Sequence, residues 1–83
     1  MYTIYSKAGC IFCDAAMELL DKKDLPYVEV KVTNSEAAMN LFKERKWKTV
    51  PQIFDGQGNH VGGYQDLKES FEWPDNPAEK NSF

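Results

Sequence analysis

The sequence predicts a small α/β domain in which a four-stranded mixed sheet is flanked by three helices. Some short segments alternate apolar and polar residues, and longer segments repeat apolar residues at helical spacing. Glycine- and proline-containing stretches separate these segments, which follow one another in the order β-α-β-α-β-β-α. Eighty-three residues provide only one hydrophobic core, so all seven segments belong to a single domain.

The first part of the chain predicts a β-α-β unit. Residues 2–5 form a short strand, and a helix follows from Ile11 to Lys23. The helix ends before Pro26, because a proline disfavours helical geometry in the residue that precedes it. Residues 27–32 alternate apolar and charged side chains, which is typical of a strand, and a right-handed crossover makes the two strands parallel. The helix stripe expected to face the core consists of Phe12, Ala16, Leu19 and Leu20.

A second helix is predicted after the second strand. Thr33-Asn34-Ser35-Glu36 has the spacing of a capping box, which opens a helix. The basic residues 43–48 suit the negative end of the helix dipole and close it. The predicted apolar face of this helix consists of Ala37, Ala38, Leu41 and Phe42. Met17 and Met39 lie on or beside helical faces and are expected to fill the core.

The remaining segments predict a hairpin and a last helix. Residues 52–54 and 60–62 form two short strands, joined by a turn whose glycines tolerate positive φ. Gly63 leads into a helix with Tyr64, Leu67 and Phe71 on one side. We expect the domain to span residues 1–72 and residues 73–83 to form a polar, frayed tail.

Composition and charge exclude several classes of function. The net charge of −3 is unsuited to nucleic-acid binding, which needs a basic excess to neutralise phosphates. No apolar run approaches the length of a bilayer span, and the first residues lack the pattern of a signal peptide. The expected location is therefore the cytoplasm, where a cysteine pair is usually reactive rather than structural.

The two cysteines lie where the first strand meets the first helix. Cys10 is placed at the helix N-terminus, where free N–H groups and the helix dipole stabilise a thiolate. Such settings lower a thiol pKa from about 8.5 to about 3.5–7.5. We expect the Cys10 sulfur to accept hydrogen bonds from the N–H groups of Phe12 and Cys13, with Lys7 adding positive charge. Cys10 is then the nucleophile, and Cys13 is the buried, resolving thiol.

Two plainer explanations of the cysteine pair stay open. The pair could be inert core thiols, although its position at an element boundary favours redox chemistry. Zinc needs about four ligands, and His60 is the sole histidine, so a zinc site would require two chains. We therefore expect no metal site within one chain.

Three motifs carry a resemblance to a known family. They are Lys7 followed by Cys10-Ile11-Phe12-Cys13, then Thr49-Val50-Pro51-Gln52, and finally Gly62-Gly63-Tyr64-Gln65-Asp66-Leu67. Together they resemble a glutaredoxin of the thioredoxin fold, over roughly residues 1–72, and most closely the small dithiol glutaredoxins of phages and bacteria. The resemblance implies glutathione-dependent reduction of protein disulfides and glutathione mixed disulfides. It also implies glutathione as cosubstrate without a tightly bound cofactor, disulfide-containing client proteins such as ribonucleotide reductase, a monomer, and action in the cytoplasm (of the host, for a phage protein).

The resemblance also implies a glutathione-binding site. A cis bond between Val50 and Pro51 would expose the backbone of Val50, which could pair with glutathione as a short added strand. The first N–H groups of the last helix would hold the γ-glutamyl carboxylate, and the Asp66 carboxylate would meet its ammonium group. The full set of implied contacts is Lys7, Phe12, Thr49, Val50, Pro51, Gly63, Tyr64, Gln65 and Asp66.

Each of these residues also has a structural explanation. Pro51 could begin an edge strand, Thr49 could be a simple β-former, and Asp66 could be a stabilising first-turn acid. Lys7 could be a solvated loop lysine, and Gly63 part of a tight turn. Arg45, Lys46 and Lys48 could attract the glycine carboxylate or form a solvated face. The sequence leaves Trp47 either as a packing cap or as a groove wall, and it favours a structural role for His60.

One departure from the family pattern opens a different function. The commonest dithiol centre of the family has Pro-Tyr between its cysteines, whereas this chain has Ile11-Phe12. Some glutaredoxins without the proline bind iron–sulfur clusters. The alternative is therefore a dimer in which each Cys10 and two glutathione thiolates hold a [2Fe–2S] cluster. A non-enzymatic adaptor of the same fold is disfavoured, because all three motifs needed for turnover are present.

Overall fold

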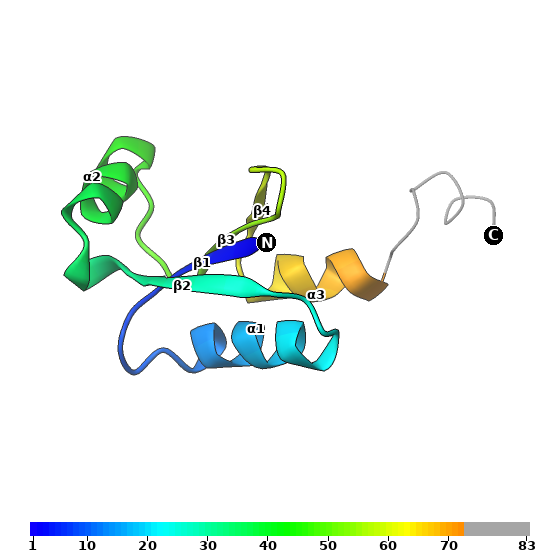
Figure 1. Cartoon of the computed structure of the whole chain (residues 1–83). Helices are drawn as coiled ribbons and strands as arrows, with labels where there is room; N and C mark the ends of the chain where they lie inside the picture. Colours follow the sequence, from blue (N-terminus) through cyan, green and yellow to red (C-terminus); the bar gives the residue numbers. More distant parts are fainter. Residues whose placement is uncertain (73–83) are drawn as a thin grey trace.

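The computed structural model describes residues 1–72, and the expected tail over residues 73–83 lies outside the described part (Figure 1). The element order β-α-β-α-β-β-α is confirmed, with one short 3-10 turn added before α2. The elements are β1 (Tyr2–Ser6), α1 (Ile11–Lys22), β2 (Tyr27–Lys31), η1 (Val32–Asn34), α2 (Glu36–Arg45), β3 (Gln52–Phe54), β4 (His60–Gly62) and α3 (Tyr64–Glu72).

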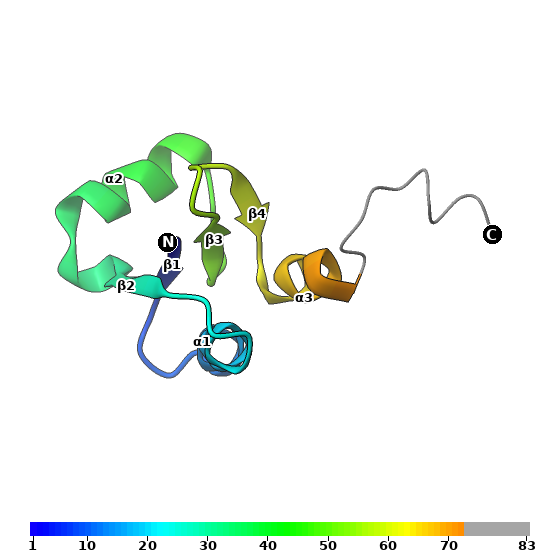
Figure 2. The same ribbon diagram turned by 45° about the vertical axis from the view of Figure 1, so that its right-hand side comes forward.

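The four strands form one mixed sheet in the order β2-β1-β3-β4. β1 is parallel to β2 and antiparallel to β3, and β3 is antiparallel to β4. Helices α1 and α3 lie together under one face of the sheet, and α2 lies over the other (Figures 1 and 2). The fold class expected from the sequence is therefore confirmed.

The hydrophobic core lies between the sheet and the α1–α3 pair. Its fully buried members are Ile4, Ala16, Leu20, Ile53 and Leu67. The expectation that Phe12 faces this core is wrong, since its side chain is 56% exposed. Phe12 lies in the first turn of α1, where its ring faces the ring of Tyr64 at 6.1 Å instead of the sheet. The buried stripe of α1 starts one residue later, at Cys13.

Helix α2 is packed much less deeply than α1. Ala38 is its one buried residue, and the expectations that Ala37 faces the sheet and Met39 fills the core are wrong, because both are exposed. An aromatic cluster fills the space on this face of the sheet. It consists of Tyr5, Phe42, Trp47, Phe54 and His60, with neighbouring ring centroids 4.8–6.0 Å apart.

The start of α2 differs from the expected capping box. Ser35, not Thr33, is the N-cap, and its hydroxyl accepts a hydrogen bond of 3.1 Å from the N–H of Ala38. Thr33 is taken up in η1, which continues the chain from the end of β2. Because both Ser35 and Thr33 have side chains that can cap a helix, their spacing from later residues did not distinguish them.

The β3–β4 hairpin is closed by Asp55. Its carboxylate accepts hydrogen bonds from the N–H groups of Asn59 (2.9 Å) and Gln57 (2.8 Å). These backbone donors, first Asn59 and then Gln57, hold the pKa of the Asp55 carboxyl below its ordinary value of 3.8. The turn therefore favours the ionised form of this side chain.

Candidate functional site

Cys10 occupies the N-cap position of α1 and forms a disulfide with Cys13. The Cys10 sulfur accepts a hydrogen bond of 3.1 Å from the N–H of Cys13, while the expected second bond from Phe12 is not formed. An N-cap side chain can reach the N–H two or three residues into the helix, and here only the third, that of Cys13, is bonded. Cys13 is 1% exposed and Cys10 is half-buried, so the sulfur open to a partner is that of Cys10.

A loop before β3 faces this disulfide. The Val50–Pro51 peptide bond is cis, as the resemblance implied, and Pro51 is buried. The carbonyl oxygen of Val50 lies 3.7 Å from the Cys10 sulfur. Within residues 1–72, no acceptor is bonded to the Val50 N–H, so this donor is available to an incoming chain.

The structure brings eight of the nine expected glutathione contacts around one cavity of about 360 Å³. The residues that line it are Phe12, Thr49, Val50, Pro51, Gly63, Tyr64, Gln65 and Asp66. These residues come from three separate segments of the chain, and the cavity lies beside Cys10 through its Val50 wall. Its volume is within the ordinary range of small-ligand sites, about 300–1,000 Å³.

The start of α3 forms one end of this cavity. The first N–H groups of a helix have no partner inside it, and here they belong to Tyr64, Gln65 and Asp66. The Asp66 carboxylate turns back and accepts a hydrogen bond of 3.0 Å from the N–H of Gly63. A Cβ on Gly62, whose φ is +120°, would lie 2.8 Å from the Asp66 Cγ. The Asp66 side chain thus stabilises the start of α3, and its carboxylate remains exposed.

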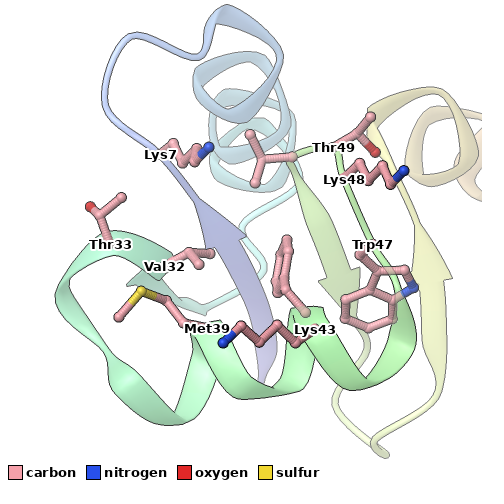
Figure 3. A pocket seen from close by; sticks show the side chains of 10 residues that line it. Lys7, Val32, Thr33, Met39, Lys43, Trp47, Lys48 and Thr49 are labelled. Carbon is pink, nitrogen blue, oxygen red and sulfur yellow. The ribbon is translucent and has the colours of Figure 1, made fainter.

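Lys7, the ninth expected contact, lies in a neighbouring groove. This groove has a volume of about 410 Å³ (Figure 3), and it shares Thr49 and Val50 with the cavity of about 360 Å³. Trp47 also lines it while its ring packs on Phe42 and Phe54. Trp47 is therefore both a packing residue and a groove wall.

Gln52 ends the second motif, but sequence reasoning gave it no role, and the structure shows that it supports the site through Thr49. Its side chain is only 8% exposed, and its Nε2 donates to the Thr49 carbonyl oxygen (3.1 Å) and to the Thr49 hydroxyl (3.4 Å). Its Oε1 lies 2.8 Å from His60 Nε2. Because a carbonyl oxygen only accepts, the Gln52 amide must present its NH2 to Thr49, so His60 Nε2 carries the hydrogen. The His60 ring stacks on Trp47 at 4.8 Å.

This network ties the Thr49–Pro51 loop to the β3–β4 hairpin. The expected structural role of His60 is consistent with it. A polar residue directly after Pro51, at a position that begins a strand, was the signal in the sequence that could have identified Gln52.

Residues 1–72 lack two features that would change the assignment of the site. No group of three or more His, Cys, Asp or Glu side chains is arranged there to hold a metal ion. None of the helices in that range has the length and apolar character needed to cross a bilayer.

Comparison with known proteins identifies the family. The family model described as glutaredoxin matches residues 2–61. Glutaredoxin 1 of Rickettsia prowazekii is 45% identical over 67 residues, which are 77% of this chain and 70% of that protein. The hybrid peroxiredoxin hyPrx5 of Haemophilus influenzae is 36% identical over 69 residues, and there the match covers 83% of this chain but only 28% of the longer protein.

A solved structure agrees with the sequence matches. The solution structure of glutaredoxin from Brucella melitensis superposes with a TM-score of 0.70 at 32% identity, covering 86% of this chain and 77% of that one. The matched residues include the cysteine pair and the loop that faces it. The chain therefore belongs to the glutaredoxin family of thiol–disulfide oxidoreductases, with Cys10 and Cys13 as its redox pair.

Proposed function

We propose that this protein uses glutathione to reduce protein disulfides and glutathione mixed disulfides. The observation that carries the proposal is the cavity of about 360 Å³ beside Cys10, lined by the eight residues whose motifs implied glutathione. A glutathione sulfur at Cys10 would leave the tripeptide backbone beside the free Val50 N–H, where a short added strand can form. The γ-glutamyl carboxylate would then reach the first N–H groups of α3.

The reaction on a client disulfide begins with the Cys10 thiolate. It attacks one client sulfur, a Cys10–client disulfide forms, and the other client sulfur leaves as a thiolate that takes up a proton. Cys13, deprotonated, attacks the Cys10 sulfur, releases the second client thiol and closes the Cys10–Cys13 disulfide. Two electrons have then passed from the cysteine pair to the client.

Glutathione returns these two electrons. One glutathione thiolate attacks Cys10, which releases Cys13 as a thiol and leaves glutathione bound to Cys10 through a disulfide. A second glutathione thiolate attacks that glutathione sulfur, so oxidised glutathione leaves and the Cys10 thiolate is restored. A glutathione mixed disulfide of a client enters directly at the Cys10–glutathione stage, so Cys13 is not needed for it.

The N-terminal end of α1 supports this assignment of roles. The N–H of Cys13 and the positive end of the helix dipole both favour negative charge on the Cys10 sulfur. Cys13 is enclosed and cannot meet a client directly. We further propose a monomer acting in a reducing compartment such as the cytoplasm, with ribonucleotide reductase among the candidate clients.

The test compares Cys13→Ser with Cys10→Ser in reduction of the mixed disulfide between glutathione and mercaptoethanol. Cys13→Ser is expected to retain turnover, whereas Cys10→Ser is expected to abolish it. Equal loss in both variants would contradict the roles. Visible absorption after anaerobic preparation with glutathione, lost in Cys10→Ser, would instead support the cluster-binding dimer.

A further inference from the structure

We propose that the buried hydroxyl of Ser6 and the carboxylate of Glu29 form a proton path that serves the thiol of Cys13. The path leads from the Cys13 sulfur to the Ser6 Oγ and from there to the Glu29 Oε2 at the edge of the sheet. The inference rests on the proposed function, because it takes Cys13 as the thiol that resolves the Cys10–client disulfide. It goes further by naming the groups that remove the proton from Cys13.

The resolving step needs a proton acceptor inside the protein. Cys13 must lose its proton before it attacks, since the thiolate is the nucleophile. Its side chain is only 1% exposed, so bulk water does not reach the sulfur. The hydrogen bond from the first turn of α1 goes to the Cys10 sulfur, so it favours the attacking thiolate and not the resolving one. A polar group is therefore expected beside Cys13 on the buried side of α1.

Ser6 is a polar side chain enclosed at the end of β1. It is 0% exposed, and its Oγ lies 2.7 Å from the Glu29 Oε2. Because a carboxylate oxygen only accepts, the Ser6 hydroxyl donates in this bond, and its lone pairs remain for a second donor. No donor among residues 1–72 is bonded to the Ser6 oxygen. The enclosed oxygen can therefore accept a hydrogen bond, and then a proton, from a thiol.

The topology places Ser6 opposite Cys13. Helix α1 packs on β1 and runs back along it, because it connects β1 to the parallel strand β2 (Figure 1). Ser6 is two residues after Ile4, so both side chains point to the face that α1 covers. The buried residues of α1 are Cys13, Ala16 and Leu20. Ser6 and Cys13 are the members of these two rows nearest the loop between β1 and α1, and we expect them to meet there.

Glu29 connects the enclosed Ser6 to solvent. It lies on β2, the outer strand beside β1, and its side chain is 30% exposed, so its carboxylate can release a proton to water. The other titratable groups beside it are Lys31, whose Nζ lies 3.5 Å from the Glu29 Oε2, and Tyr27. Partial burial, then the charges of Asp21 and Glu29, raise the pKa of Tyr27 above 10.0. Tyr27 therefore stays protonated at neutral pH, which leaves the Glu29 carboxylate as the acceptor.

The proposed step balances one proton and one electron pair. The Cys13 thiol gives its proton to the Ser6 Oγ, while the Ser6 hydroxyl proton passes to the Glu29 Oε2. The Cys13 sulfur then attacks the Cys10 sulfur, the Cys10–Cys13 disulfide forms, and the client sulfur leaves with the electron pair of the broken bond. Glu29 releases its proton to water. When glutathione opens the disulfide, the same path runs in reverse and returns a proton to Cys13.

The first experiment follows the two thiol reactions separately by stopped-flow absorbance. The reduced protein is mixed with an equimolar amount of dithiobis(nitrobenzoate), an aromatic disulfide whose thiolate is coloured. Attack by Cys10 releases the first coloured thiolate, and attack by Cys13 on the resulting mixed disulfide releases the second. Cys13→Ser should show the first release alone, which identifies the second phase as the resolving step.

Three substitutions interrupt or preserve the path. Ser6→Ala should slow the second phase by about 100-fold, the lower end of what general-base catalysis contributes, and leave the first within about two-fold. Glu29→Gln still accepts a hydrogen bond from Ser6 but cannot take up a proton, so we expect a similar loss. Ser6→Thr keeps the hydroxyl and should retain the second phase within about five-fold. The matched controls are Ser70→Ala in α3 and Glu18→Gln on the exposed side of α1, and both should leave both phases within about two-fold.

The pH dependence separates a proton path from a structural role. Without the path, Cys13 must lose its proton to hydroxide, so the deficit of Ser6→Ala in the second phase should shrink as the pH rises from about 6 to about 9. A lost packing contact would leave the deficit unchanged over this range. The inference would be overturned by an unchanged deficit, by a second phase within about two-fold of wild type in Ser6→Ala or Glu29→Gln, or by a Ser6→Thr variant as slow as Ser6→Ala.

A second readout tests the contact without turnover. In the reduced Cys10→Ser protein, Cys13 is the sole thiol, and its S–H stretching band is recorded by infrared spectroscopy. A hydrogen bond to the Ser6 oxygen weakens the S–H bond, so Ser6→Ala should move the band to higher frequency, whereas Ser70→Ala should not. A band that Ser6→Ala leaves in place would overturn the inference. Neither experiment contains glutathione, so a failure of glutathione turnover would count against the proposed function alone.

Discussion

Replacing Gln52 by leucine tests whether the loop that faces Cys10 is held by the amide network. Leucine has nearly the length of glutamine and keeps the buried site filled, but it can neither donate nor accept. The substitution removes the 3.1 Å bond to the Thr49 carbonyl and the 2.8 Å bond to His60. The 3.4 Å contact with the Thr49 hydroxyl is long and contributes little.

The expected loss in the free energy of unfolding follows from counting these hydrogen bonds. A neutral hydrogen bond contributes a net of about 0.5–1.5 kcal/mol, so losing two costs about 1–3 kcal/mol. No further penalty arises, because Thr49 and His60 are exposed and water can replace the lost partner. For a domain of this size, a loss of 2 kcal/mol lowers the melting temperature by roughly 8–16 °C. The KM for glutathione mixed disulfides should also rise, since Thr49 and Val50 line the proposed glutathione cavity.

The assay is urea unfolding of the wild-type protein, Gln52→Leu, His60→Phe and the double variant. His60→Phe keeps an aromatic ring on Trp47 and removes both ring nitrogens, including the Nε2 that donates to Gln52. Because Gln52 and His60 share one hydrogen bond, the two losses should not add, and the coupling should be about 1 kcal/mol. Additive losses, or a Gln52→Leu variant within about 0.5 kcal/mol of wild type, would refute the reasoning.

Three other substitutions probe the core, the glycine before α3 and the hairpin turn. Leu20→Ala should lower the free energy of unfolding by about 2–5 kcal/mol in urea titrations, because Leu20 is fully buried between α1 and the sheet. Gly62→Ala should cost more stability than Gly58→Ala and should also raise the KM for glutathione disulfides, since only the first adds a clash with Asp66 to a positive φ. The lowered pKa of Asp55 means that its ionised form stabilises the fold above the ordinary value of 3.8, and this contribution is lost as pH falls through the folded-state pKa. The urea midpoint should therefore drop between pH 6 and pH 3 by more in the wild type than in Asp55→Asn.

Each of these predictions has an outcome that contradicts it. A Leu20→Ala loss below about 1 kcal/mol would mean that the core repacks around the gap. Equal effects of alanine at Gly62 and Gly58 would show that the contact with Asp66 does not matter. An identical acid dependence in Asp55→Asn and wild type would show that other carboxyl groups set the pH response.

The order of the elements was predictable because each boundary is marked locally. Pro26 follows the first helix, which ends at Lys22 before the left-handed Asp24, and the glycines of residues 55–59 mark the hairpin, so the periodic segments between them were easily separated. The residues around the cavity were also predictable, since three motifs lie at element boundaries that the fold brings together. Their binding roles stay a prediction until glutathione is tested.

The features that the sequence did not reveal depend on how deeply a side chain is buried and on which residues pair across neighbouring strands. Periodicity indicates which face of a helix is apolar, but not how closely that face approaches the sheet, and this is why Met39 was wrongly placed in the core. Phe12 fits the helical period, yet its ring lies beside the ring of Tyr64 instead of in the core. The Gln52–His60 bond depends on the register between β3 and β4, which no local pattern encodes.

The two faces of the sheet are packed unequally. The α1–α3 side holds the buried core, and the α2 side is packed less deeply. The chemistry depends on α1 and α3, which share the buried core, whereas α2 is attached largely through one alanine and a set of rings. Mutations on the outer surface of α2 can therefore accumulate at little cost to the sulfur chemistry. A chain built in this way is free to acquire new clients while its redox centre stays the same.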